Sequence, residues 1–371
     1  MSPQVNHHPV LRVRLVEIPL PAGSRDPEVL IDWMLNSLGL IRSKGANKST
    51  LDRMGGINKI MSQCFLKSTS SGWTAAEISD LTGISSTGVH NQLVKLTESG
   101  LLSGINVDGK RTYMVNGGSF QNSAELIGIN TLTIAKQRLR ILSGHIAESQ
   151  DRMVVPAENE AVPFRMNVVS LMPTSKEIGI AQLSRDLGFD GDRIRFDDDL
   201  HIDLMNILAS AHKPLGINRL MEETGGTRAR IGRILGRMRS AGFLERAVVA
   251  SRLDLDIFTG LLRQYNARGS DWIMSRGGLS RFPKDVQKSL TDSLESGEHS
   301  LEGVEESLEK LTIDEKGLFL NMLGGRVPLG YRVKGATGDE VLRSILSGLE
   351  RVVSRISTIS GRLDEVILKS D

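Results

Sequence analysis

One unit occurs twice in the sequence, and this repeat limits what the chain can fold into more than any other feature. Residues 81–102 (LTGISSTGVHNQLVKLTESGLL) align without a gap with residues 223–244 (ETGGTRARIGRILGRMRSAGFL), at an offset of 142. Each copy has a Thr-Gly pair near its start, apolar residues at matching positions, and a Gly two residues before its final Leu. A register kept through several apolar positions predicts one structural unit in two copies.

The first copy and its neighbours predict three helices followed by a β-hairpin. Apolar spacing marks the helices, and a capping box of Thr74 and Glu77 opens the second one. Gly83 suits a left-handed position after that helix, and Asp108-Gly109 is a strong hairpin signal. The helices are expected at residues 51–68, at residues 74–81, and from Ser85 or Ser86 to about Ser99.

Three helices and a hairpin resemble the winged helix-turn-helix of prokaryotic transcriptional regulators of the MarR and ArsR type. The resemblance covers residues 45–118 and, for the helical part, residues 201–256. It implies two winged-helix-like domains with small β-hairpin wings. Together with a C-terminal coiled-coil-like helix, expected from a heptad pattern, this gives a mainly α fold. After Leu244 the stretch ERAVVASRLDLDIF alternates like a strand but has no Asp-Gly turn, so the second wing is expected to be short or absent.

Charge and apolar patterning divide the rest of the chain. Residues 201–252 carry nine Lys/Arg against four Asp/Glu, whereas residues 283–371 carry twelve against sixteen. Such asymmetry is typical of chains with separate nucleic-acid-binding and assembly parts. We expect residues 1–44 to form a strand of alternating apolar and basic residues and a helix; 45–118 the first winged-helix domain; 119–150 a long connecting or dimerisation helix; 151–200 a linker with a short helix; 201–256 the second winged-helix-like domain; 257–335 a helical acidic region; and 336–371 a heptad helix.

The third helix of the second copy is strongly basic. At 100° per residue its apolar side chains form one stripe, and Gly232 and Gly236 lie on another face between arginines. Low bulk suits close approach to bases, and cations suit phosphates, so this helix is predicted to lie against double-stranded DNA. Close packing against another helix and a merely solvated basic face are the alternatives. The predicted DNA contacts are Arg228, Arg230, Arg233, Arg237 and Arg239.

The third helix of the first copy presents mixed polar groups instead. An Asn can pair with an adenine edge, and a Lys can reach a phosphate or a guanine. In the hairpin two basic residues follow the turn and could reach an adjacent groove. An ordinary polar helix surface is the alternative interpretation. The predicted DNA contacts of this copy are Ser86, Thr87, His90, Asn91, Lys95, Lys110 and Arg111.

The C-terminal segment carries a heptad pattern, with apolar residues at alternating spacings of three and four. Its partner is either the same helix of a second protomer or an apolar face within the chain. We favour the protomer, because a homodimer would suit paired half-sites on DNA. The predicted dimerisation residues are Leu342, Ile345, Leu349, Val352, Ile356, Ile359, Leu363 and Val366.

Other signals of chemistry are weak. Cys64 is the only cysteine, so neither a disulfide framework nor a Cys-based zinc site is expected. Aspartates at residues 190–199 have no metal-ligand spacing and are expected to be solvated, with Asp198 or Asp199 capping a helix. We find no P-loop, no nucleophile–base constellation, no signal peptide and no long apolar run. We therefore expect a cytoplasmic protein with no membrane contact, no cofactor, no metal and no enzymatic activity.

These observations predict a sequence-specific, double-stranded DNA-binding transcriptional regulator that acts as a homodimer and contacts the transcription machinery. The competing hypothesis is a non-enzymatic winged-helix scaffold of a chromosome or replication complex that binds mainly protein. The scaffold hypothesis predicts that another chain covers Gly232 and Gly236, whereas the regulator hypothesis predicts an open strip. RNA binding is a weaker third class, because aromatic residues that could stack on bases make up only 4% of the chain.

Overall fold

The computed structural model describes residues 11–41, 55–170, 179–191 and 199–369. Helices make up 61% and strands 11% of it, which confirms a mainly α fold with small antiparallel sheets. Most buried apolar residues belong to one large core, and a second, separate core lies between residues 253 and 323. No helix in these described ranges is both long and apolar enough to cross a bilayer.

The first half of the chain contains the elements that the repeat predicts. The Thr74 hydroxyl accepts a hydrogen bond from the Glu77 N–H at 3.3 Å, and Ser85 caps the next helix. Gly83, Asp108 and Gly109 have the positive φ angles expected of their turns. The elements are β1 (Leu11–Val16), α1 (Pro27–Ser37), α2 (Gly56–Ile60), η2 (Met61–Phe65), β2 (Trp73–Thr74), α3 (Ala75–Thr82), α4 (Ser86–Glu98), β3 (Leu102–Val107), β4 (Lys110–Val115) and α5 (Phe120–Ser143).

The second half repeats this order of elements. A short helix, α6 (Asp151–Val154), joins the halves. Pro27 begins α1 after β1, and Ile180 begins its counterpart α7 after β5. The repeated elements are β5 (Arg165–Ser170), α7 (Ile180–Asp186), α8 (Leu200–Ser210), α9 (Ile217–Thr224), α10 (Arg228–Ser240), β6 (Leu244–Val248), β7 (Leu329–Val333) and α16 (Gly338–Ile367).

Strand pairing extends the repeat beyond the segment visible in the sequence. In the first half Tyr113 of β4 lies opposite both Trp73 of β2 and Gly104 of β3. In the second half Tyr331 of β7 lies opposite both Leu215 and Arg246 of β6. Leu215 follows Trp73 by the same 142 residues that separate the two copies in the sequence. The second copy therefore has paired strands at the positions of the first hairpin, and the expectation of a short or absent second wing did not include the distant strand β7.

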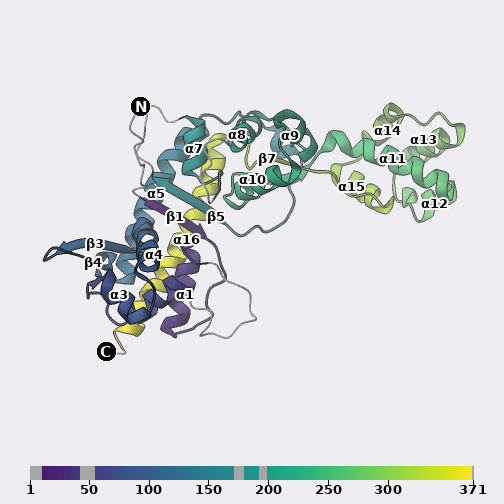
Figure 1. Ribbon diagram of the computed structural model, residues 1–371. Helices are drawn as coiled ribbons and strands as arrows, with labels where there is room; N and C mark the ends of the chain where they lie inside the picture. The colour runs from purple at the N-terminus through teal and green to yellow at the C-terminus, as the bar shows by residue number, and fades with distance from the viewer. Residues whose placement is uncertain (1–10, 42–54, 171–178, 192–198, 370–371) are drawn as a thin grey trace.

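The turn of the second hairpin is replaced by a helical lobe with its own core. Val248 and Leu329 are paired neighbours in the sheet, although residues 249–328 lie between them. This long insertion explains why no turn signal follows β6, and α11 crosses the domain boundary expected at residue 256. The lobe, which projects from the molecule in Figure 1, consists of α11 (Ala250–Arg268), α12 (Ser270–Ser275), α13 (Lys284–Ser296), α14 (Leu301–Leu308) and α15 (Ile313–Met322).

The halves join through two pairs of equivalent elements. Strand β1 pairs antiparallel with β5, so that Arg14 lies opposite Asn167. Helices α5 and α16 pack closely and run in opposite directions (Figure 1). The Asp364 carboxylate near the end of α16 accepts hydrogen bonds from the first two N–H groups of α5, at 3.1 and 2.8 Å. At the other end of the pair, Gly338 of α16 lies against the Ser143 carbonyl of α5.

The heptad seam of α16 is covered by this arrangement. Six of its eight predicted residues are buried in the large core, and Leu342 and Val366 pack against that core. The partners are α5, α1 and β1 of the same chain. The apolar face within the chain is thus the partner surface, and not the second protomer that we favoured. The homodimer itself stays a prediction.

Candidate nucleic-acid interface

Helix α4 is held by an apolar stripe and leaves its polar face outside. Val89, Leu93 and Leu96 are buried in the large core, each with at most 1% of its surface exposed. Because residues on the opposite face cannot reach this core, they are free to contact a partner. The five predicted contacts of the helix, Ser86, Thr87, His90, Asn91 and Lys95, are all exposed.

The hairpin of β3 and β4 extends from this module. Lys110 and Arg111 follow its turn, and both are exposed as predicted. The Arg111 guanidinium carbon lies 5.8 Å from the centre of the Tyr113 ring, which steadies the long side chain without neutralising its charge. The hairpin therefore presents two cations beside α4.

Helix α10 has the same buried stripe, formed by Ile231, Ile234, Leu235 and Met238. A Cβ added to Gly232 or Gly236 would meet no described atom within 4 Å. The glycine strip is therefore uncovered by the described part of the chain, as the DNA-binding hypothesis requires. Because no packing contact there offsets the weak helix propensity of glycine, the two glycines cost α10 about 1 kcal/mol each relative to Ala.

Three of the five predicted arginines of α10 are exposed, namely Arg228, Arg230 and Arg233. Their contacts are local: Arg228 donates to the Asn218 Oδ1 at 3.3 Å, and Arg233 donates to the Ala229 carbonyl of its own helix at 3.2 Å. These partners are neutral, so within the described ranges no carboxylate pairs with Arg228 or Arg233.

The other two arginines make contacts inside the protein, and their role in DNA binding stays a prediction. Arg237 donates to the carbonyls of Phe189 (2.8 Å) and Asp190 (3.2 Å). Arg239 forms an ion pair with Glu160 at 2.7 Å, and its side chain is only 16% exposed. The helical wheel places both arginines beside the strip of Gly232 and Gly236. It cannot show which distant segments of the chain contact them.

A basic surface that the sequence analysis did not include lies on the outer face of the ribbon formed by β1 and β5. Alternate residues of a strand point away from the core, and so Arg12 and Arg165 are exposed. Neither has an ion pair or side-chain hydrogen bond within the described ranges. Between them Arg14 donates to the Asn167 Oδ1 at 2.9 Å. The alternation of basic and apolar residues in the N-terminal strand was the signal that could have identified this face.

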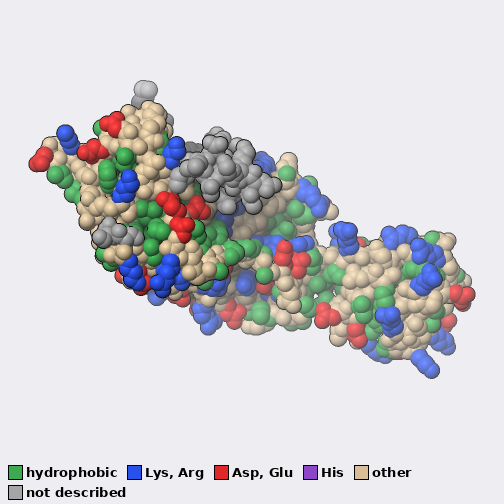
Figure 2. Space-filling view, turned by 90° about the horizontal axis from the view of Figure 1, so that it is seen from below, with side chains coloured by type: hydrophobic (Ala, Val, Ile, Leu, Met, Phe, Trp, Pro, Cys, Tyr) green, Lys and Arg blue, Asp and Glu red, His purple; other side chains and the backbone are tan. Residues whose placement is uncertain are grey.

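A hollow of about 330 Å³ opens beside the ribbon. Lys95 of α4 lines it together with Arg12 and Arg14 of β1, so the exposed face of α4 continues into the ribbon. Asp190, which also lines it, is held next to Arg237 of α10. Burial raises the pKa of Asp190 to about 6, with Arg237 and Arg185 opposing the shift. Figure 2 shows the molecule from below, with Lys and Arg side chains scattered over the visible surface.

Two further observations concern metal binding and family membership. Within the described ranges, no group of three or more His, Cys, Asp or Glu side chains is arranged to hold a metal ion. Asp199 precedes α8 without a side-chain capping bond, and Asp192, Asp197 and Asp198 lie outside the described residues. Comparison with protein-family models, with curated proteins and with solved structures finds no match to this chain.

Proposed function

We propose that each repeat is a winged helix-turn-helix and that the chain is a sequence-specific, double-stranded DNA-binding protein that regulates transcription. The observation that carries the proposal is the outer face of α10. It combines an uncovered strip at Gly232 and Gly236 with the exposed cations of Arg228, Arg230 and Arg233. A helix that enters the major groove needs low bulk facing the bases and positive charge facing the phosphates.

Helices α4 and α10 have different roles in the proposed DNA binding. Helix α4 offers an exposed amide at Asn91 and hydroxyls at Ser86 and Thr87, which can discriminate base edges. Helix α10 offers mainly guanidinium groups, which release counterions from the DNA backbone and raise affinity for any sequence. We therefore assign base reading chiefly to α4 and backbone binding chiefly to α10.

A salt titration tests the proposal directly. The full chain is titrated against a pool of random 40-bp duplexes by fluorescence anisotropy at several salt concentrations. Replacing Arg228, Arg230 and Arg233 by Ala should weaken binding and lower the slope of log K against log[salt] by about three units, because about one counterion is released per phosphate contact. The control replaces three exposed cations of the lobe, Arg281, Lys284 and Lys288, and should leave the slope unchanged. Equal effects of the two triple variants would contradict the proposal.

A protein scaffold is the second candidate, and the helical lobe favours it. The lobe has its own core and projects from the rest of the molecule (Figure 1), so a partner can reach it from several sides. The same position suits contact with the transcription machinery. A folded chain that binds no duplex at any salt concentration in the titration would favour the scaffold function.

A further inference from the structure

The two halves of the chain are related by an approximate two-fold axis that passes between Arg14 and Asn167. These residues lie opposite each other in the antiparallel ribbon and are 153 residues apart. Helices α1 and α7 also begin 153 residues apart, at Pro27 and Ile180. The equivalent helices α5 and α16 pack antiparallel. Antiparallel pairing of equivalent elements in two places is what a two-fold relation produces.

The ends of α1 and α7 support the same axis. Each helix is followed directly by Leu-Gly, and Gly39 and Gly188 have similar φ angles of 61° and 72°. Gly39 lies against the side chain of Arg14, and Gly188 lies against that of Asn167. A Cβ at either glycine would overlap the neighbouring side chain of the ribbon. The two glycines therefore make equivalent close contacts in the two halves.

This axis places the two DNA-binding helices on opposite sides of the ribbon. Helix α4 contacts β1, and helix α10 contacts β5. Lys95 of α4 and Arg237 of α10 are at equivalent positions, 142 residues apart. Lys95 lines the hollow, and Arg237 donates to the Phe189 carbonyl in the segment that borders the hollow. In two-fold regulators such a pair of helices comes from two chains that bind two half-sites. Here one chain supplies both.

The ribbon of β1 and β5 also carries positive charge, at the position where the centre of a DNA site with two half-sites would lie. Arg12 and Arg165 are 153 residues apart, so they are related by the same axis as Arg14 and Asn167. Both are exposed on the outer face and lack ion pairs within the described ranges. Their symmetric positions would match phosphates of the two strands on either side of the dyad of a duplex.

Building on the proposed function, we propose that a single chain binds an imperfect inverted repeat in double-stranded DNA, with α4 on one half-site and α10 on the other. Arg12 and Arg165 contact the backbone between the half-sites. The inverted arrangement follows from the two-fold axis. The half-sites differ in sequence because α4 and α10 present different side chains, as the pairs Asn91/Arg233 and His90/Gly232 show.

Selection of bound duplexes from a random library, followed by measurement of the mass of the complex, tests this proposal. The expected site is an inverted repeat of two unequal halves at one fixed spacing, bound with one chain per duplex. Insertion of 5 or 10 bp between the halves should each reduce affinity at least tenfold, because packed α5 and α16 prevent the modules from separating. Two chains per site, or a direct repeat, would overturn the inference but leave DNA binding intact. Failure to select any duplex would overturn the proposed function itself.

The ribbon contact is tested separately on the selected site. The variant R12A/R165A should lower the slope of log K against log[salt] by about two units, since two phosphate contacts are lost. The variant K284A/K288A removes the same charge from exposed positions of the lobe and should not change the slope. A slope that R12A/R165A leaves unchanged would remove the ribbon from the interface.

Discussion

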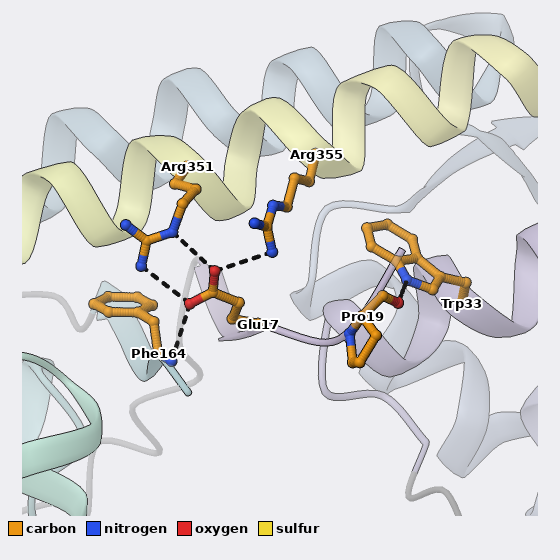
Figure 3. Close-up of polar contacts among 6 residues, drawn as sticks. All are labelled: Glu17, Pro19, Trp33, Phe164, Arg351 and Arg355. Atoms are coloured by element: carbon orange, nitrogen blue, oxygen red, sulfur yellow. Dashed lines mark hydrogen bonds and ion pairs between the residues drawn. The ribbon is translucent and has the colours of Figure 1, made fainter. Parts of the chain in front are cut away.

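The carboxylate of Glu17 accepts two hydrogen bonds from the guanidinium of Arg351, at 2.8 and 3.0 Å, across 334 residues of sequence (Figure 3). Arg355 adds an ion pair at 2.9 Å, and the Phe164 N–H donates to the same carboxylate at 3.2 Å. Glu17 thus connects the end of β1 with α16 and with the residue before β5. Its hydrogen bonds and ion pair stabilise the junction of the two halves.

This junction makes stability depend on pH. The hydrogen bond from Arg351 is the main cause that lowers the pKa of Glu17. A lowered pKa in the folded state adds stability above the pKa of the unfolded chain, and this stability is lost as the pH falls through the folded-state value. Glu17→Gln should reduce the free energy of unfolding at pH 7 by about 1 kcal/mol, since Arg351 is half exposed and screened.

Urea unfolding of wild type and Glu17→Gln between pH 3 and pH 7 measures this effect. The difference between the two proteins should shrink as the pH falls below about 4, where an unperturbed Glu becomes protonated. Arg219→Ala, which breaks the exposed pair with Glu223 on α9, is the control and should cost under about 0.5 kcal/mol. A difference that stays constant over the whole pH range would contradict the assignment.

Asn91→Ala should relax sequence preference without loss of folding. Asn91 is exposed on α4, so its removal leaves the buried stripe intact. Loss of an amide that pairs with an adenine edge should cost about 1–3 kcal/mol of discrimination at one or two positions. Sites selected by the wild type and by the variant show the change, and identical sites from both proteins would exclude Asn91 from base reading.

Arg233→Ala and Arg237→Ala should have opposite consequences, although they lie one helical turn apart. Arg233 is exposed, so its loss should weaken DNA binding and leave stability unchanged within about 0.5 kcal/mol. Arg237 supports the segment after α7 through two carbonyls, so its loss should cost about 1–2 kcal/mol of folding free energy. Thermal melts and DNA titrations of the two variants separate these roles. A stable Arg237→Ala variant with weakened DNA binding would restore the sequence-based assignment.

Deletion of residues 338–371 should unfold the large core and not convert a dimer to a monomer. The seam of α16 is buried against α5, α1 and β1, so its removal exposes apolar faces of all three. The milder variant Ile356→Ala should lower the free energy of unfolding by about 2–5 kcal/mol, as expected for a fully buried side chain. Circular dichroism of the deletion and urea unfolding of Ile356→Ala measure these effects. A folded deletion protein of half the mass would support the protomer interface instead.

Replacement of residues 249–328 by the four-residue turn of the first hairpin, Val107 to Lys110, should give a folded protein. Val248 and Leu329 are paired in the sheet just as Asn106 and Arg111 are, so the short turn closes the same register. The lobe has a separate core, and the large core should keep its stability within about 1 kcal/mol. Urea unfolding and DNA titration check this variant. Loss of the large core on excision would show that the lobe is not an independent insertion.

The sequence by itself determined the local structure and the existence of the repeat. Caps at Thr74 and Ser85, the left-handed turn at Gly83 and the buried stripes of α4 and α10 were all predictable. Each depends on residues within a few positions of one another. The exposed faces of α4 and α10 followed from the same periodicity, because a residue opposite a buried stripe faces away from the core.

The tertiary structure alone decided what lies against each of these elements. A heptad pattern shows that one face of α16 is apolar, but any matching apolar face can cover it, and here α5 of the same chain does so. Strand β6 found its partner β7 beyond an 80-residue insertion, because the entropy of closing a loop rises only slowly with its length. The sequence also could not show that distant carbonyls hold Arg237 and a distant carboxylate holds Arg239. Nor could it show that Arg12 and Arg165 lie on one two-stranded ribbon. Those relationships join distant segments, and no local pattern specifies them.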